Sequence, residues 1–260
     1  MLIEKLEEKN YSNNELLLKE MVLNIGNPNP YIRDKLIYNA FLEIITKNYL
    51  TNAQLKNLFE QLVTTQYFLY KIGSKNDDTV YKRSFSALTL GILINKDKEQ
   101  SFLEKSHISF SLDKTCFFLL NEQDRRGFTN EKGWAHSIAH CADLLDEIVT
   151  HPLFEQNLYE KTLESILFCV NDPFVYEDDE LERLSTPSAT LINRYGLSKE
   201  YLNTIDRLIS NFLSKKSYSH LDTRIMSNVR NYLRAIYFKI NTEESKQVLL
   251  DYLKKIHEKY

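Results

Sequence analysis

KGWAHSIAHCADLLDE, residues 132–147, is the stretch that decides the fold, because it is typical of a helix with two opposite faces. At about 100° per residue, a helix over 133–150 gathers its apolar residues on one stripe. That stripe consists of Ile138, Cys141, Ala142, Leu145, Ile148 and Val149, with Trp134 at its edge. The opposite face consists of His136, His140, Asp143 and Glu147. We expect the stripe to face a helical core and the polar face to point to solvent or into a groove.

Helical periodicity continues on both sides of this stretch, and no run of alternating polar and apolar residues interrupts it. The chain has only 6 Gly and 5 Pro in 260 residues, too few for the turns of a many-stranded sandwich or barrel. The predicted helices cover residues 2–9, 13–25, 31–48, 52–66, 78–95, 110–121, 133–150, 154–170, 177–194, 198–214, 221–239 and 243–258. The fold class is therefore all-α.

The predicted helices recur in pairs, and the pairs repeat at a spacing of roughly 44–55 residues. Such a spacing is typical of an α-α superhelix, a HEAT-like or armadillo-like solenoid, here of about five to six helix pairs. No linker divides the chain, so we expect one solenoid domain over residues 1–260. An insertion is expected at about 96–132, where the spacing between pairs is longest. Insertions in solenoids often carry function.

Composition and charge narrow the functional classes. With 43% hydrophobic and 27% charged residues and no long apolar run, the chain is expected to be soluble and not bound to a membrane. The net charge of −3 gives no basic surface for nucleic acid, which is therefore not expected as a partner. Cys116, Cys141 and Cys169 lie far apart and show no metal or disulfide spacing, and no secretion signal is present, which favours the cytoplasm.

The polar face of helix 133–150 has three interpretations. His136 and His140 lie one helical turn apart, so they could bind a divalent metal such as zinc with Asp143 as a third ligand. An open fourth position would then allow a metal-dependent hydrolase, with Glu147 or Glu180 as general base. Alternatively, the face is a hydrogen-bonded network without catalysis, or it lines a groove for a polar ligand.

Other segments place polar residues where they could share this groove. Arg83 lies opposite the apolar stripe of helix 78–95, and Glu180 and Arg183 lie one turn apart at the start of helix 177–194. In the loop before the histidines, Asp124 and Arg126 could fold over the helix start and bind an anion, or fix the loop to acidic neighbours. Proline at position 187 predicts a kink or a break into two short helices.

Three segments resemble a known bacterial family, the domain-of-unknown-function 2785 family. They are VYKRSFSALTLGILINKD (80–97), EQDRRGFTNEKGWAHSIAHCADLLDEI (122–148) and DDELERL (178–184), and the resemblance covers most of residues 30–240. It implies an armadillo-like α-α superhelix and no particular activity. The positions that match the family pattern are Arg83, Asp124, Arg126, Gly127, Gly133, Trp134, His136, His140, Asp143, Glu180 and Arg183.

Two functions therefore remain open. The first is a non-enzymatic solenoid that binds a peptide, a protein or a small anionic ligand. Its groove is expected to contain Arg83, Asp124, Arg126, Trp134, His136, His140, Asp143, Glu180 and Arg183. The alternative is the metal-dependent hydrolase with His136, His140 and Asp143 as ligands. A helical-repeat protein that acts on DNA bases is disfavoured by the acidic balance and the single Trp.

Overall fold

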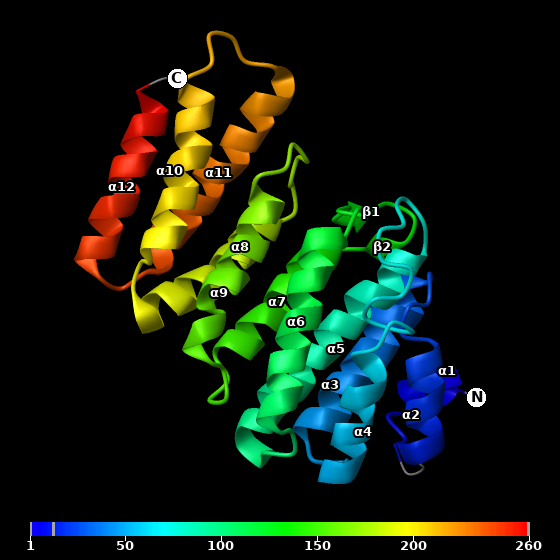
Figure 1. Cartoon of the computed structure of the whole chain (residues 1–260). Coiled ribbons are helices and arrows are strands. Elements are labelled where there is room, and N and C mark those ends of the chain that lie inside the picture. Colours follow the sequence, from blue (N-terminus) through cyan, green and yellow to red (C-terminus); the bar gives the residue numbers. More distant parts are fainter. Residues whose placement is uncertain (1, 12–13, 259–260) are drawn as a thin grey trace.

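The computed structural model describes residues 2–11 and 14–258, which form helices almost throughout (Figure 1). The helices are α1 (Leu2–Glu7), α2 (Asn14–Leu23), the π-helix η1 (Tyr31–Tyr38), α3 (Asn39–Thr46), α4 (Asn52–Leu62), α5 (Thr79–Gln100), α6 (Lys105–Asn121), α7 (Ser137–Val149), the 3₁₀-helix η2 (Gln156–Leu158), α8 (Tyr159–Val170), α9 (Glu180–Tyr195), α10 (Lys199–Leu213), α11 (His220–Lys239) and α12 (Glu243–His257). Each predicted helix overlaps one of these, although the start predicted at residue 13 lies outside the described residues. The all-α class is confirmed.

The helices pack in two rows. In the first row α3, α5, α7, α9 and α11 each contact the next, and in the second row α6, α8, α10 and α12 do the same. Contacts of α6 with α7, α8 with α9 and α10 with α11 join the rows (Figure 1). Most of the buried apolar side chains form one core cluster, whose members extend along the chain from Leu6 to Ile256. The middle helices of the first row are therefore covered on several sides.

The helix predicted over 133–150 begins later than expected. Residues Gly133–Trp134 form strand β2, which pairs antiparallel with β1 (Phe128–Thr129), and His136 has a left-handed backbone with φ of 48°. Two long-range bonds explain the delay, because Ala135 N donates to Gly127 O at 2.9 Å and His136 N donates to Arg126 O at 2.9 Å. These amides bind the preceding loop, so the helix starts only after them.

The segment expected as an insertion, 96–132, is mostly helical. Residues 96–100 continue α5 and α6 covers 105–121, so the irregular chain consists of the turn 101–104 and the loop 122–132, which contains β1. A tight turn allows this compact path: Ser101 has a φ of 51°, and Leu103 N donates to the buried Asp97 carboxylate at 2.6 Å. The helical periodicity therefore predicted α5 and α6 to be shorter than they are.

Pro187 lies inside the continuous helix α9, so of the two predicted outcomes, a kink or a break into two short helices, the break is wrong. Proline removes one helical hydrogen bond, but its fixed φ is close to the helical value. The neighbouring turn is supported from α11, where Lys239 Nζ donates to Glu182 O at 2.6 Å and to Ser185 Oγ at 2.8 Å. Packing against the next helix thus holds the chain helical through the proline.

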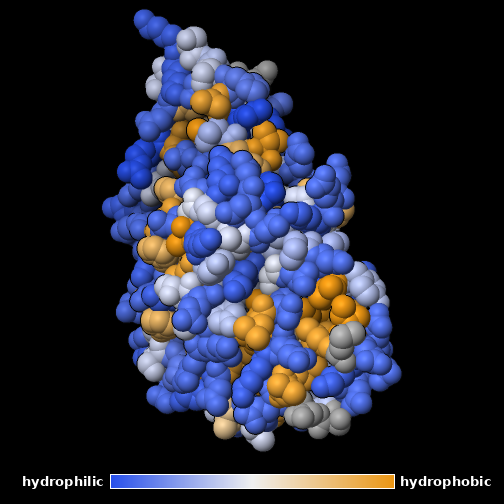
Figure 2. All heavy atoms as spheres, turned by 90° about the vertical axis from the view of Figure 1, so that its right-hand side faces the viewer, coloured by the Kyte–Doolittle hydropathy of each residue, from blue (hydrophilic) through white to orange (hydrophobic). Residues whose placement is uncertain are grey.

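The face shown in Figure 2 is mainly hydrophilic, with several local apolar patches. The large apolar side chains exposed on the first two helices are Ile3, Leu16 and Leu23. Among the described residues, no helix combines the length and the apolar character needed to cross a membrane.

Helix α4 offers a test of local stabilisation. Thr51 accepts a hydrogen bond from Gln54 N, and the Gln54 side chain accepts one from Thr51 N, which is the capping box that the sequence pattern of these residues predicts. We expect Thr51→Ala to lower the free energy of unfolding by about 1 kcal/mol in urea titrations. The matched control is Thr242→Ala at the start of α12, where the side chain makes no capping bond. A control loss as large as that of Thr51→Ala would contradict this explanation.

Candidate functional site

The start of α7 is held in place by Arg33, a fully buried residue of η1. Its guanidinium donates to Lys132 O at 2.7 Å and to Asn27 O at 2.9 Å, and it lies 4.2 Å from the ring centre of Tyr81. Arg33 therefore connects the N-terminal helices to strand β2. Its role was not predicted, because only a long-range contact to a backbone carbonyl distinguishes it.

Arg83 does not reach a groove. It is fully buried and binds Glu122 through two bonds, Nε to Oε2 at 2.6 Å and Nη2 to Oε1 at 2.9 Å. A further bond from Nη1 reaches Tyr70 O at 3.0 Å. Burial raises the pKa of Glu122, and the facing Arg83 opposes that rise. Arg83 thus joins α5 to the end of α6, so its expected place in a ligand groove is wrong.

Asp124 and Arg126 also have structural roles. Arg126 Nε donates to Asp124 Oδ1 at 2.8 Å, and Asn76 N donates to Asp124 Oδ2 at 2.9 Å. The Asp124 carbonyl accepts from Ser137 Oγ at 2.7 Å, at the first residue of α7. These contacts hold the loop against the helix start. Neither residue lines the cavity described below.

The two histidines lie close together and are buried, with 5% of His136 and 7% of His140 exposed. Their ring centres are 5.4 Å apart, with 67° between the ring planes. His136 precedes the helix, and His140 packs edge-on against Phe85 of α5. The expectation that both lie on an outward helical face is therefore wrong, because α5 covers that side of α7.

Hydrogen bonds define the proton positions on both rings. His136 Nε2 lies 2.6 Å from Asp178 O, a carbonyl that can only accept, so Nε2 carries the proton. The Ser84 hydroxyl donates to Ala135 O and lies 2.7 Å from His140 Nδ1. Since that hydroxyl proton is used, Nδ1 of His140 is the donor. The lone pairs are then on His136 Nδ1 and His140 Nε2, and neither atom has a hydrogen-bond partner within the described residues.

The surroundings keep both rings neutral. Burial lowers the pKa of His136, partly offset by the Asp178 carbonyl, and the positive charge of Arg183 lowers it further. For His140, burial lowers the pKa well below its usual range, and the charges of His136 and Arg183 act in the same direction. At neutral pH both imidazoles therefore offer an acceptor nitrogen.

A cavity of about 420 Å³ lies beside the two rings. It is lined by Trp134, His136, His140, Glu177, Asp178, Asp179 and Arg183. The Trp134 ring stacks on His136, with 4.7 Å between ring centres and 25° between planes. The sequence had singled out four of these seven residues. It missed the three acids that directly precede α9.

The acidic candidates occupy neighbouring positions. Asp143 forms an ion pair with Arg183 at 2.5 Å, and burial raises the pKa of Asp143 against the effect of Arg183. Glu180 is buried, accepts from Asp178 N at 3.0 Å and lies 3.5 Å from His136 Nε2. Burial raises the pKa of Glu180 as well. Asp143 therefore holds Arg183, and Glu180 holds the backbone of Asp178, at the lining of the cavity.

The three predicted metal ligands are not brought together. In the part of the chain that the structure describes, no three His, Cys, Asp or Glu side chains gather closely enough to hold a metal ion. Asp143 lines a separate cavity of about 300 Å³. Glu147, a candidate general base, binds Lys98 at 2.5 Å. Ser84 contacts His140 but is fully buried, so it cannot act as a nucleophile on a bound substrate.

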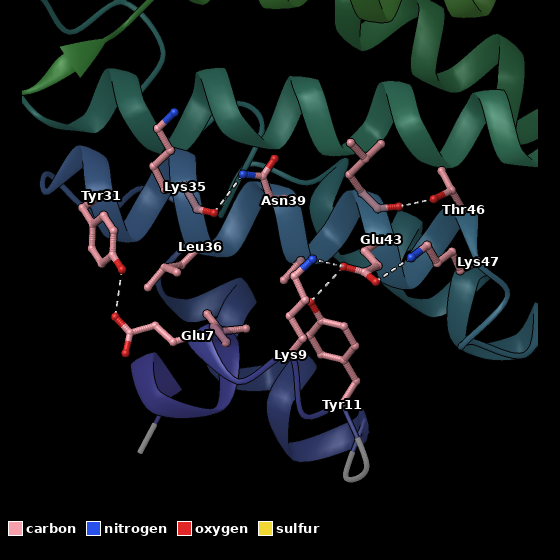
Figure 3. Close-up of a pocket in the computed structure, with 13 residues that line it drawn as sticks. Glu7, Lys9, Tyr11, Tyr31, Lys35, Leu36, Asn39, Glu43, Thr46 and Lys47 are labelled. Atoms are coloured by element: carbon pink, nitrogen blue, oxygen red, sulfur yellow. Dashed lines mark hydrogen bonds and ion pairs between the residues drawn. The ribbon is translucent and has the colours of Figure 1, made fainter.

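A larger cavity, of about 730 Å³, lies between α1 and the helices η1 and α3 (Figure 3). Figure 3 shows Tyr31 directed at Glu7, and Lys9, Tyr11 and Lys47 directed at Glu43, whereas the Lys35 ammonium points away from them. Tyr31 Oη donates to Glu7 at 2.8 Å, and Lys9 and Lys47 lie 3.3 Å and 2.7 Å from Glu43. Since these partners satisfy each other, the smaller cavity at the histidines is the better candidate for a site.

Fold and site define an all-helical protein with a polar cavity at the N-terminus of α7. The model of the family described as "protein of unknown function (DUF2785)" matches residues 68–238, and the chain belongs to this family. The resemblance inferred from the histidine segment is thereby confirmed, although the match begins at 68 and not near 30. Neither the curated proteins nor the solved structures give a significant match.

The close approach of Gly127 to Asp178 gives a prediction about the cavity. A β-carbon at residue 127 would lie 1.9 Å from Asp178 Oδ2 and 2.8 Å from Asp178 Cβ, so rotating the carboxylate alone cannot relieve the clash. We expect Gly127→Ala to lower the free energy of unfolding by about 1–3 kcal/mol and to shift the His136 resonances in NMR spectra. Gly91→Ala is the matched control, since its β-carbon would meet its nearest atom at 3.7 Å. Equal effects of both changes would contradict the role of Gly127.

The lowered pKa values predict how stability changes with pH. Below pH 6.5 an unfolded histidine binds a proton that the folded ring excludes. The contribution of each neutral ring to the free energy of unfolding is therefore full above pH 6.5 and falls as the pH drops toward the lower pKa of the folded state. Each pKa unit of difference between the unfolded and the folded state corresponds to about 1.4 kcal/mol in the free energy of unfolding. Urea unfolding between about pH 7.5 and about pH 5.5 should therefore show a smaller loss in His140→Asn than in the original chain. Asp143 and Glu180, with raised pKa values, act in the opposite direction in both proteins. Identical pH profiles would rule out this role for His140.

Proposed function

We propose that this protein is a bacterial, cytoplasmic binding protein, and that its single domain is a HEAT-like or armadillo-like α-α superhelix over residues 1–260. The two rows of helices support this arrangement, since each row is formed by alternate helices of the chain. In such solenoids the surface of one row serves as an extended binding face. The family membership supports a shared architecture and names no reaction.

The binding face that we propose is a groove along the first row of helices. Three cavities follow one another there, of about 300, 420 and 200 Å³. The first is lined by side chains of α3, α5 and α7, and Asp143 in its wall pairs with Arg183 of the second. The second and third share Glu177 and Asp179. A peptide segment or a small polar molecule would fit this series of cavities.

One observation carries the proposal: two nearly buried imidazoles line the middle cavity, and neither His136 Nδ1 nor His140 Nε2 has a hydrogen-bond partner within the described residues. Neither nitrogen is among the fully buried side-chain atoms that lack a partner, so both are open to a ligand or to water that can donate a hydrogen bond. Catalysis is less well supported. The bases that the hydrolase would need are occupied, Glu147 by Lys98 and Glu180 by Asp178 N. We therefore favour binding over metal-dependent hydrolysis.

The proposal is tested by ligand mapping on the full-length protein. The imidazole resonances of His136 and His140 are followed by NMR while a library of small polar compounds and short peptides is added. We expect at least one class of compound to shift both sets of resonances. In His140→Asn the amide can still donate to Ser84, but the ring nitrogen Nε2 is lost, so binding at about pH 7.5 should weaken by about tenfold.

Two outcomes would contradict the groove. One is a library in which no compound shifts either histidine. The other is a compound that binds with the same affinity to His140→Asn as to the original chain. Arg83→Lys, a change at a residue that lines none of the three cavities of the proposed groove, serves to show that altered folding stability alone does not abolish binding.

A further inference from the structure

The rim of the histidine cavity carries an excess of negative charge. Glu177, Asp178 and Asp179 line it, and within the described residues their carboxylates form no ion pair. The Asp178 carboxylate accepts from Phe128 N at 2.8 Å, which fixes its position but does not neutralise it. Glu177 and Asp179 are exposed, so their charges face whatever enters.

Arg183 does not compensate for this excess. Its guanidinium is already paired with Asp143 at 2.5 Å, so the pair as a whole contributes no net charge. The histidines are neutral as well, for the reasons given above. Acids therefore outnumber free cations around the cavity, and the electrostatic potential there favours a positive ligand. A small anionic ligand, one of the partners expected from the sequence, is disfavoured by the same charges.

The hydrogen-bonding groups of the cavity also favour a positively charged ligand. The proton of His136 is used by Asp178 O and that of His140 by Ser84 Oγ, so both rings can only accept from a ligand. The three carboxylates also only accept. Trp134, 39% exposed and stacked on His136, adds an aromatic wall against which a cation can lie. A ligand that matches these walls must carry several N–H donors and a positive charge.

We propose that this cavity binds an organic cation, a primary ammonium or guanidinium group at the end of a lysine or arginine side chain or of a free polyamine. The proposal rests on the proposed binding function and specifies its ligand. The cavity volume of about 420 Å³ suits such a group with part of its alkyl chain. A bare metal ion fits less well, because no three ligating side chains converge within the described residues.

The test is calorimetric titration of the full-length protein at low salt. The probes are Nα-acetyl-arginine amide, Nα-acetyl-lysine amide and spermidine, with Nα-acetyl-citrulline amide as the neutral counterpart of the first. We expect the cations to bind at least about tenfold more tightly than the citrulline compound, and added salt to weaken their binding. Tighter binding of the amino-acid amides than of spermidine indicates a peptide side chain as the source, and the reverse indicates a free polyamine.

Two double variants test whether the cations bind at the rim of this cavity. Glu177→Gln combined with Asp179→Asn removes two rim charges, and asparagine tolerates the left-handed backbone of residue 179, with φ of 64°. We expect about tenfold weaker binding of the cations. The matched control, Glu164→Gln with Glu200→Gln, changes the net charge equally at exposed positions that line none of the three cavities, and should leave affinity unchanged.

Several results would overturn the cation inference. They are equal affinity for the citrulline and arginine compounds, equal weakening by both double variants, and zinc binding that requires His140 while the organic cations fail to bind. A neutral or anionic compound that shifts the two histidines would refute the cation and leave the proposed binding function intact. The absence of any compound that shifts them would refute both.

Discussion

The burial of one cation, Arg33, is the constraint on which the site depends. Removing a guanidinium from water costs several kcal/mol unless partners replace the solvent. Here the partners are Asp34 at 2.7 Å, backbone carbonyls and the ring of Tyr81. Burial still lowers the pKa of Arg33. Because a bond from this side chain reaches Lys132 O, satisfying the charge also fixes strand β2, and β2 leads directly to His136.

Opposing forces act on the histidines, and burial is the larger. Nearby carboxylates would favour protonated rings, and Coulomb attraction from Asp178 and Asp143 raises the pKa of His136. Desolvation and the positive charge of Arg183 act against them, and the resulting pKa is lowered. The pairing of Arg183 with Asp143 thus has two effects, since it reduces the pull of one acid and places a cation near the rings. A neutral, accepting pair beside an acidic rim is the consequence.

The sequence predicted the helices and the grouping of the histidines, and it failed where the chain is covered on more than one side. Helical periodicity found α5 and α7, because their apolar residues repeat as expected. The helical periodicity assumed one buried face for each helix, whereas α5 lies between neighbours and buries Arg83 and Ser84 as well as apolar residues such as Phe85. The late start of α7 was also out of reach, because long-range bonds to Gly127 and Arg126 decide it.

Residues 127 and 178 form a sterically coupled pair, so the residue at position 127 in a relative indicates whether that relative keeps the geometry of this cavity. Any side chain at 127 would occupy the space of the Asp178 carboxylate, and that residue also supplies the carbonyl that fixes the tautomer of His136. A relative with a larger residue at 127 must therefore have moved the segment before α9. In such a relative the ring of His136 would lose its orienting partner. Glycine at this position thus distinguishes relatives that keep the binding geometry from relatives that keep only the helical scaffold.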